Sequence, residues 1–277
     1  MLASGCSGLA YAVANAPALF GNYDRSTNHA YGDDAAQRLD VYSPKQATNR
    51  PVVIFWHGGS WTSGRRGLYR FVGAALAARG FVTVLPDYRL FPQAKFPLFL
   101  QDGARAIAWV QQHAQQFGGD PHRIVLMGHS AGAHEAAFLA YDRQLLLQAG
   151  ANPQWIVGFV GLSGPYALVP DSEVLNTIFA SPYQEADWQP VRFVTPRAPP
   201  TFLAHGMADD VVSIRHAEKL RDVLLANHVR VETEFYPGKG HSDTAAALSI
   251  PARGRAPVLD QSVRFIESVT APGGVAP

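Results

Sequence analysis

Residues 123–133 constrain the fold of this chain more than any other segment. Four apolar residues, 124–127, lead into Gly128-His129-Ser130-Ala131-Gly132 and then into an alanine-rich stretch with helical spacing. This is the pattern G-x-S-x-G, and its flanks predict a strand, a tight turn and a helix. Glycine two residues either side of the serine leaves room where strand and helix approach each other. The turn would therefore hold the Ser130 hydroxyl above a sheet edge, at the positively polarised start of the helix.

The rest of the chain alternates short apolar runs with amphipathic segments. The runs carry few polar residues, as strands buried on both faces do. We predict strands at 38–42, 52–56, 81–85, 123–127, 155–162, 201–204 and 230–236, and helices at 71–78, 98–117, 131–149, 213–227 and 257–269. This alternation predicts an α/β fold with a mostly parallel central sheet and helices on both faces.

The domain organisation follows from the same pattern. We predict a single domain over residues 36–270, between an N-terminal tail at 1–35 and a C-terminal tail at 271–277, because no linker-like change of composition interrupts it. Residues 165–200 break the alternation: the segment is rich in proline, carries aromatic residues and follows a strand on its carboxyl side, where ligands bind in open α/β sheets. We expect a small cap-like insertion there, with simple packing as the alternative.

Charge and composition exclude some classes of binding partner. Lys and Arg number 23 against 22 Asp and Glu, so the formal net charge is +1. This balance argues against nucleic-acid binding and against electrostatic binding to membranes, and no apolar run is long enough to span a bilayer. The resulting expectation is a cytoplasmic protein, or an exported one if the given start lies inside a longer precursor.

Cys6 is the one cysteine in the chain. Residues 2–6, Leu-Ala-Ser-Gly-Cys, resemble the processing site of a bacterial lipoprotein, in which the cysteine would carry a lipid anchor. The five residues before Cys6 do not provide the basic and apolar regions of a signal peptide. A simple N-terminal tail is therefore the alternative.

A serine hydroxyl needs a base to take its proton and a carboxylate to orient that base. In the predicted architecture these groups follow in the order Ser, Asp, His. Asp209 stands at the carboxyl end of strand 201–204, and we take it as the acid. The adjacent Asp210 is the alternative, although we expect it to cap the following helix. His241, on a glycine-flanked loop after the last strand, is the predicted base.

The other histidines near these motifs receive different roles. We expect His205 to be structural and bonded to the backbone near the acid loop. His129 and His134 flank the serine, and neither is predicted to be catalytic; His134 either lines the site or faces the core.

A negatively charged tetrahedral intermediate requires fixed hydrogen-bond donors. The glycine-containing segment after strand 52–56 can bring its backbone close to a substrate oxygen. We predict the amides of Gly59, Ser60 and Ala131 as the oxyanion hole, with His57 orienting the loop. Gly58 and Trp61 are the predicted substrate contacts, although an aromatic residue at position 61 is nearly as often simple packing.

Together these motifs resemble those of α/β-hydrolases, and more narrowly of bacterial carboxylesterases related to the hormone-sensitive lipase group and to arylformamidases. His57-Gly58-Gly59-Ser60-Trp61 resembles their H-G-G-x-W oxyanion motif, and residues 87–92, D-Y-R-L-F-P, resemble their D-Y-R-L-x-P segment. Residues 128–134, G-H-S-A-G-A-H, are similar to the serine motif of these esterases. The resemblance covers about 36–268. It departs at Ser60, where lipase-group members have glycine, which favours the formamidase-like and carbohydrate-esterase branch.

Within the D-Y-R-L segment we expect Asp87 and Arg89 to be structural, with Asp102 as a partner for Arg89.

The leading functional hypothesis is hydrolysis of a small carboxylic ester, with a short acyl chain, through an acyl-enzyme on Ser130. The same machinery would also cleave an N-formyl amide, as in arylformamidases, because the two reactions differ in leaving group and pocket shape. A relative that binds ligands without turnover is the third hypothesis, and the presence of all three catalytic residue types argues against it. We expect no cofactor and no metal, because no metal-ligand cluster stands out. The sequence leaves the oligomeric state open.

Overall fold

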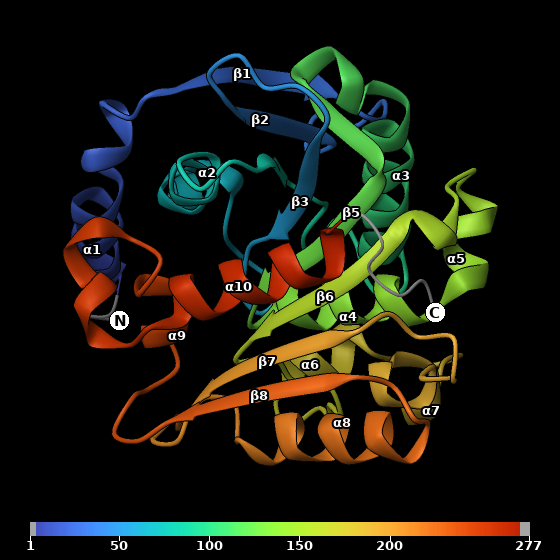
Figure 1. Ribbon diagram of the computed structural model, residues 1–277. Helices are drawn as coiled ribbons and strands as arrows, with labels where there is room; N and C mark the ends of the chain where they lie inside the picture. The colour runs from blue at the N-terminus through green and yellow to red at the C-terminus, as the bar shows by residue number, and fades with distance from the viewer. Residues whose placement is uncertain (1–3, 272–277) are drawn as a thin grey trace.

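An eight-stranded sheet crosses the molecule in the order β1-β2-β4-β3-β5-β6-β7-β8 (Figure 1). The computed structural model describes residues 4–271 and the side chains of residues 8–271. β2 pairs antiparallel with β1 and β4, and every pairing from β4 to β8 is parallel. The strands are β1 (Tyr23–Ala30), β2 (Arg38–Pro44), β3 (Arg50–Trp56), β4 (Val82–Pro86), β5 (Gly119–His129), β6 (Ile156–Leu162), β7 (Thr201–Gly206) and β8 (Val231–Tyr236).

Helices cover both faces of the sheet, as predicted, and each face has its own apolar core. Side chains of α3, α4 and α8 pack against one face, and those of α2 and α10 pack against the other. The helices are α1 (Ser4–Asn15), α2 (Arg70–Ala77), α3 (Leu98–His113), α4 (Ala131–Tyr141), α5 (Arg143–Gln148), α6 (Glu173–Ile178), α7 (Glu185–Trp188), α8 (Arg215–Ala226), α9 (Asp243–Ala246) and α10 (Val258–Thr270).

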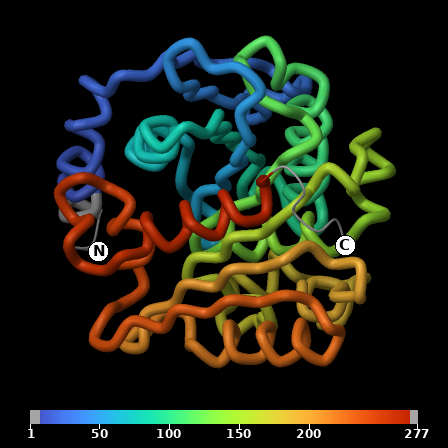
Figure 2. The backbone as a smooth tube through the Cα atoms, viewed as in Figure 1, coloured from blue at the N-terminus to red at the C-terminus, as the bar shows by residue number. Residues whose placement is uncertain are grey.

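Residues 1–35 contain regular structure where the sequence predicted a tail. β1 is an edge strand with mostly exposed side chains, so it lacks the apolar alternation that reveals a strand. α1 is held by tertiary contacts: Asn15 donates to the Leu68 carbonyl at 2.9 Å and accepts from the Phe71 amide at 2.9 Å. Figure 2 shows α1 beside the segment that precedes α10. The tail prediction is therefore wrong for these two elements.

Cys6 lies in α1, but its side chain is outside the described side chains. The lipid anchor on Cys6 stays a prediction. No helix among residues 4–271 is both long and apolar enough to cross a bilayer.

Helix 131–149 was predicted as continuous, and the structure divides it. α4 ends at Tyr141, and α5 begins after Asp142, whose carboxylate accepts hydrogen bonds from the amides of Gln144 (3.0 Å) and Leu145 (3.2 Å). A short acidic side chain that satisfies the first amides of a helix favours a new start over continuation.

The insertion at 165–200 contains α6 and α7 and packs beside the serine helix α4. The Phe179 ring meets the Trp61 ring edge-on at 4.9 Å between centroids. The Trp188 carbonyl accepts a hydrogen bond from Nε2 of His134 at 2.7 Å. The insertion therefore forms an aromatic wall next to the 57–65 segment, and its action as a cap over the site stays a prediction.

Asp102 and Arg89 form the ion pair expected from the sequence. Asp102 is fully buried on α3. Its carboxylate accepts hydrogen bonds from Nε of Arg89 at 2.8 Å and from a terminal guanidinium nitrogen of Arg89 at 2.7 Å. The Arg89 amide, at 3.1 Å, and the side-chain amide of Gln37, at 2.7 Å, also donate to it. The pair ties the loop after β4 to α3 and to the segment before β2.

Asp102→Ala should lower the free energy of unfolding by about 3 kcal/mol, because buried Gln37 and partly exposed Arg89 lose the buried carboxylate that they share. The exposed Arg221–Asp222 pair, at 2.8 Å, offers a matched control, and Asp222→Ala should cost less than about 1 kcal/mol. Urea denaturation followed by circular dichroism measures both. Equal effects of the two substitutions would contradict a special role for the buried pair.

Candidate active site

Ser130 lies at the turn between β5 and α4 with φ 56° and ψ −124°, a conformation that non-glycine residues rarely adopt. The two glycines of the motif make the turn possible. A Cβ on Gly128 would lie 2.2 Å from the Gly132 carbonyl oxygen, and a Cβ on Gly132 would lie 2.2 Å from the Trp56 carbonyl oxygen. Only hydrogen fits at either position, so G-x-S-x-G has a direct steric cause here.

The three residues predicted as nucleophile, base and acid meet in one hydrogen-bonded chain. Nε2 of His241 lies 2.9 Å from Oγ of Ser130, and Nδ1 of His241 lies 2.9 Å from Oδ2 of Asp209. Each residue follows the carboxyl end of a parallel strand: β5, β7 or β8. This is the edge at which ligands bind in open α/β sheets.

The backbone and a second histidine hold the Asp209 carboxylate. Its Oδ1 accepts from the amides of Val211 (3.0 Å) and Val212 (2.8 Å), and Nε2 of His205 lies 3.3 Å from its Oδ2. Burial alone would raise the pKa of Asp209, but the hydrogen bonds from His205, His241 and Val212 together hold that pKa well below its usual value. The carboxylate is therefore charged throughout the physiological pH range.

The alternatives around the acid are now distinguished by geometry. Nε2 of His205 donates to the Val212 carbonyl at 2.8 Å, so the prediction that His205 bonds to backbone beside the acid loop is confirmed. Asp210 is exposed, and α8 begins only at Arg215, so the expectation that Asp210 caps that helix is wrong. The intervening residues form a turn fixed by Asp209 itself.

Two further histidines support the site. Nε2 of His129 donates to the His241 carbonyl at 3.0 Å, and burial lowers the pKa of His129 to about 3, so the ring is neutral. His134 faces the core, fully buried, and burial lowers its pKa to about 4. Sequence reasoning missed these supporting contacts, because nothing but proximity to Ser130 distinguished either residue.

The loop predicted to stabilise an oxyanion, residues 57–65, has an unusual backbone. Gly59, Ser60 and Trp61 have φ values of 131°, 52° and 58° in succession. Within residues 4–271 the amides of Gly59, Ser60 and Ala131 have no hydrogen-bond acceptor. A Cβ on Gly58 would lie 3.0 Å from Cβ of Ser130, so the loop runs directly past the serine. The loop that carries the Gly59 and Ser60 amides therefore begins beside Ser130, and the three predicted donors have no acceptor among these residues.

Trp61 contributes mainly to packing. Its side chain is 3% exposed and meets the rings of His134 and Phe179 edge-on, with centroids 5.1 and 4.9 Å away. A substrate could touch only its rim, so its predicted role in substrate binding stays a prediction, as does that of Gly58.

Comparison with known proteins shows the family of the chain. The model of the prolyl oligopeptidase family matches residues 102–270, more than half of the chain, and a second family model, described as BD-FAE, matches residues 39–154. The carboxylesterase NlhH of Mycobacterium tuberculosis is 30% identical, over 78% of this chain and 73% of its own length. The chain belongs to the α/β-hydrolase esterases. Its relatives also include the isoprenylcysteine alpha-carbonyl methylesterase of Arabidopsis thaliana, 33% identical over 81% of this chain and 57% of the methylesterase.

These similarities cover part of the length of the plant relatives and extend to the fold of solved structures. The chain spans between 52% and 61% of the lengths of four plant methylesterases that it matches. Among solved structures, the truncated form of a carbohydrate esterase from gut microbiota superposes with a TM-score of 0.79 at 22% identity, over 91% of this chain and 99% of that chain. This likeness confirms the α/β-hydrolase fold.

Gly132→Ala should destabilise the protein by about 2 kcal/mol or more, because the added methyl group overlaps the Trp56 and His57 carbonyls. Gly254→Ala is the control, since a Cβ there meets nothing within 4 Å. Thermal unfolding of both variants measures the difference. An unchanged melting temperature for Gly132→Ala would show that the turn tolerates a side chain.

Proposed function

We propose that this protein hydrolyses small carboxylic esters through an acyl-enzyme on Ser130. The observation that carries the proposal is the hydrogen-bonded chain from Ser130 through His241 to Asp209, with 2.9 Å at each contact. The strained turn at Ser130 and the open amides of the 57–65 loop support it. The names of the carboxylesterase and methylesterase relatives point to the same bond type.

The geometry accounts for each step of ester cleavage. His241 takes the proton of Ser130 as Oγ attacks the ester carbonyl carbon, and the amides of Gly59, Ser60 and Ala131 receive the oxyanion. The protonated His241 then gives this proton to the departing alkoxide, which leaves as an alcohol. Water, deprotonated by His241, attacks the acyl-enzyme, and the carboxylic acid departs as the proton returns to Ser130. Asp209 orients the imidazole and stabilises its charged form.

The aromatic wall favours a short acyl chain. Trp61, Phe179 and His134 fill the space between the 57–65 loop and the insertion by packing against one another. Buried aromatic side chains in mutual contact leave little volume for a long alkyl group without rearrangement.

The first test is kcat/KM for p-nitrophenyl esters from acetyl to dodecanoyl, beside an N-formyl arylamine, with Ser130→Ala as control. We expect a maximum at acetyl or butyryl and a loss of at least about a thousandfold in Ser130→Ala. Retained turnover in Ser130→Ala would refute the nucleophile. A strong preference for the formyl amide would reassign the protein as an arylformamidase, and no turnover of either class would favour a ligand-binding role.

The adjacent aspartates permit a matched test of the acid. Asp209→Asn should lower kcat by about ten thousandfold, because the amide supports the wrong tautomer of His241. Asp210→Asn makes the same chemical change at an exposed position and should leave kcat within about twofold. Steady-state kinetics on p-nitrophenyl acetate measures both variants. The reverse pattern would assign the acid to Asp210.

A further inference from the structure

The 57–65 loop needs external support to keep its shape. Three successive residues, 59–61, have positive φ, and two of them are not glycine. Such conformations are strained in residues other than glycine and persist only where the surroundings over-determine them. The contacts that hold this loop therefore bear on the placement of the Gly59 and Ser60 amides.

Asp87, which follows β4, contacts both ends of the loop. At the first end, Nε2 of His57 lies 3.6 Å from its carboxylate; burial lowers the pKa of His57, so this ring is neutral at physiological pH. At the second end, Arg66 donates to Asp87 with both its backbone amide and its guanidinium. One carboxylate thus lies beside His57 at the start of the loop and is bonded to Arg66 directly after its end.

Arg66 extends this contact to the sheet. Nε of its guanidinium donates to Oδ1 of Asp40, on β2, at 2.9 Å. A terminal nitrogen of the same group donates to the Asn28 side chain on β1 at 3.2 Å. The guanidinium therefore bridges the carboxylate of Asp40 on β2 and that of Asp87 just after β4, which a single planar group with several fixed donors does well.

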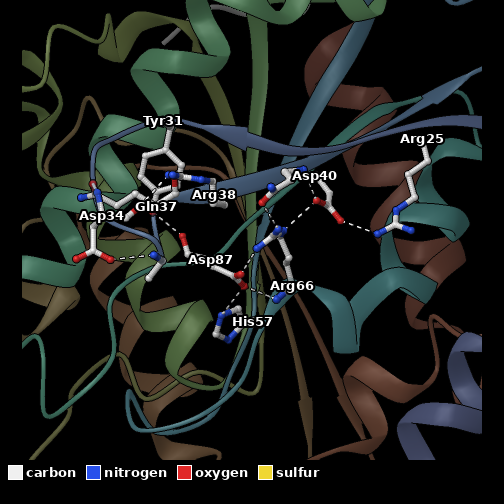
Figure 3. Close-up of polar contacts among 11 residues, drawn as sticks. Arg25, Tyr31, Asp34, Gln37, Arg38, Asp40, His57, Arg66 and Asp87 are labelled. Atoms are coloured by element: carbon white, nitrogen blue, oxygen red, sulfur yellow. Dashed lines mark hydrogen bonds and ion pairs between the residues drawn. The ribbon is translucent and has the colours of Figure 1, made fainter.

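Asp40 is the buried carboxylate in the chain of ion pairs. The residue is 3% exposed and lies between Arg66 and Arg25, whose guanidinium donates at 2.7 Å; the Asn28 amide adds a bond of 2.9 Å. Burial alone would raise the pKa of Asp40, but these donors lower it. Figure 3 shows the line of side chains from Arg25 through Asp40, Arg66 and Asp87 to His57. Two cations and two anions balance along it.

We propose that Arg66 is a positioning residue for the oxyanion loop, and that Asp40 on the sheet fixes its orientation. This inference rests on the proposed function, because the loop matters to catalysis only if its amides receive the oxyanion. Arg66 touches no reacting atom. It acts by fixing the end of the loop whose other end lies against Ser130.

This role predicts which kinetic constants change when the loop is loosened. Donors that are displaced by less than an ångström lose transition-state stabilisation, while ground-state binding of the ester changes little. A loosened loop should therefore lower kcat and leave KM nearly constant. It should also weaken a trifluoromethyl ketone inhibitor, because the tetrahedral adduct of that inhibitor with Ser130 carries the same oxyanion.

The experiment compares Asp40→Asn and Arg66→Met with Asp24→Asn, using p-nitrophenyl acetate. Asp24 is an exposed residue of β1 that pairs with Lys45, so its substitution makes the same charge change near the same strands without touching Arg66. We expect Asp40→Asn and Arg66→Met to lower kcat by about tenfold to a hundredfold, with KM within about twofold of the wild type. The inhibition constant of the trifluoromethyl ketone should rise by the same factor. Asp24→Asn should match the wild type.

Arg66→Lys separates positioning from folding. A lysine keeps the positive charge but lacks the planar, forked donors of the guanidinium. Arg66→Lys should therefore restore only part of the kcat that is lost in Arg66→Met. Melting temperatures define the range in which every variant is folded, and kinetics are compared within that range. If kcat and the inhibition constant in Asp40→Asn equal those in Asp24→Asn, the proposal is wrong. It is also wrong if kcat falls while the inhibition constant stays unchanged.

The two proposals fail in different ways. If the wild type hydrolyses no ester, or if Ser130→Ala hydrolyses as fast as the wild type, the proposed function fails. If the wild type hydrolyses esters, Ser130→Ala does not, and the Asp40 and Arg66 variants are fully active, only the positioning inference fails.

Discussion

The close approach of Gly132 to the carbonyls of Trp56 and His57 is the contact on which the site depends. It brings the start of α4 against the end of β3, so the serine turn and the oxyanion loop share one steric boundary. The segment after β3 also runs past the serine, because a Cβ on Gly58 would lie 3.0 Å from Cβ of Ser130. Any side chain at position 132 would push the serine turn away from the end of β3 and the loop that follows it. The parallel sheet then adds the acid and the base, because β7 and β8 end at the same edge as β5.

Around this contact three buried histidines are neutral and two aspartates are charged. Burial lowers the pKa of His57, His129 and His134, so these rings act as hydrogen-bonding and packing groups. Asp209 and Asp40, by contrast, each accept several hydrogen bonds that keep them ionised despite burial. Fixed carboxylates and neutral rings leave His241 next to one permanent negative charge, which stabilises the imidazolium that ester cleavage requires.

Much of the fold was readable because buried strands carry unbroken apolar runs. The runs at 52–56 and 201–204 correspond to β3 and the start of β7. β1 was missed because an edge strand with exposed polar side chains has no apolar signal, and α1 because its anchoring contacts through Asn15 are long-range. The break at Asp142 was missed because a carboxylate can either face solvent within a helix or cap a new one.

The sequence by itself determined the nucleophile turn, the order of Ser130, Asp209 and His241, and the glycine-containing oxyanion loop. Each of these is a local pattern with a steric or chemical cause within a few residues. Tertiary structure alone decided the partners that hold those groups: His205 and the backbone on Asp209, His129 on the His241 loop, and the Arg25–Asp40–Arg66–Asp87 chain beneath the oxyanion loop. These partners come from separate strands, and no spacing along the chain encodes which charged side chains a folded sheet brings within hydrogen-bond distance.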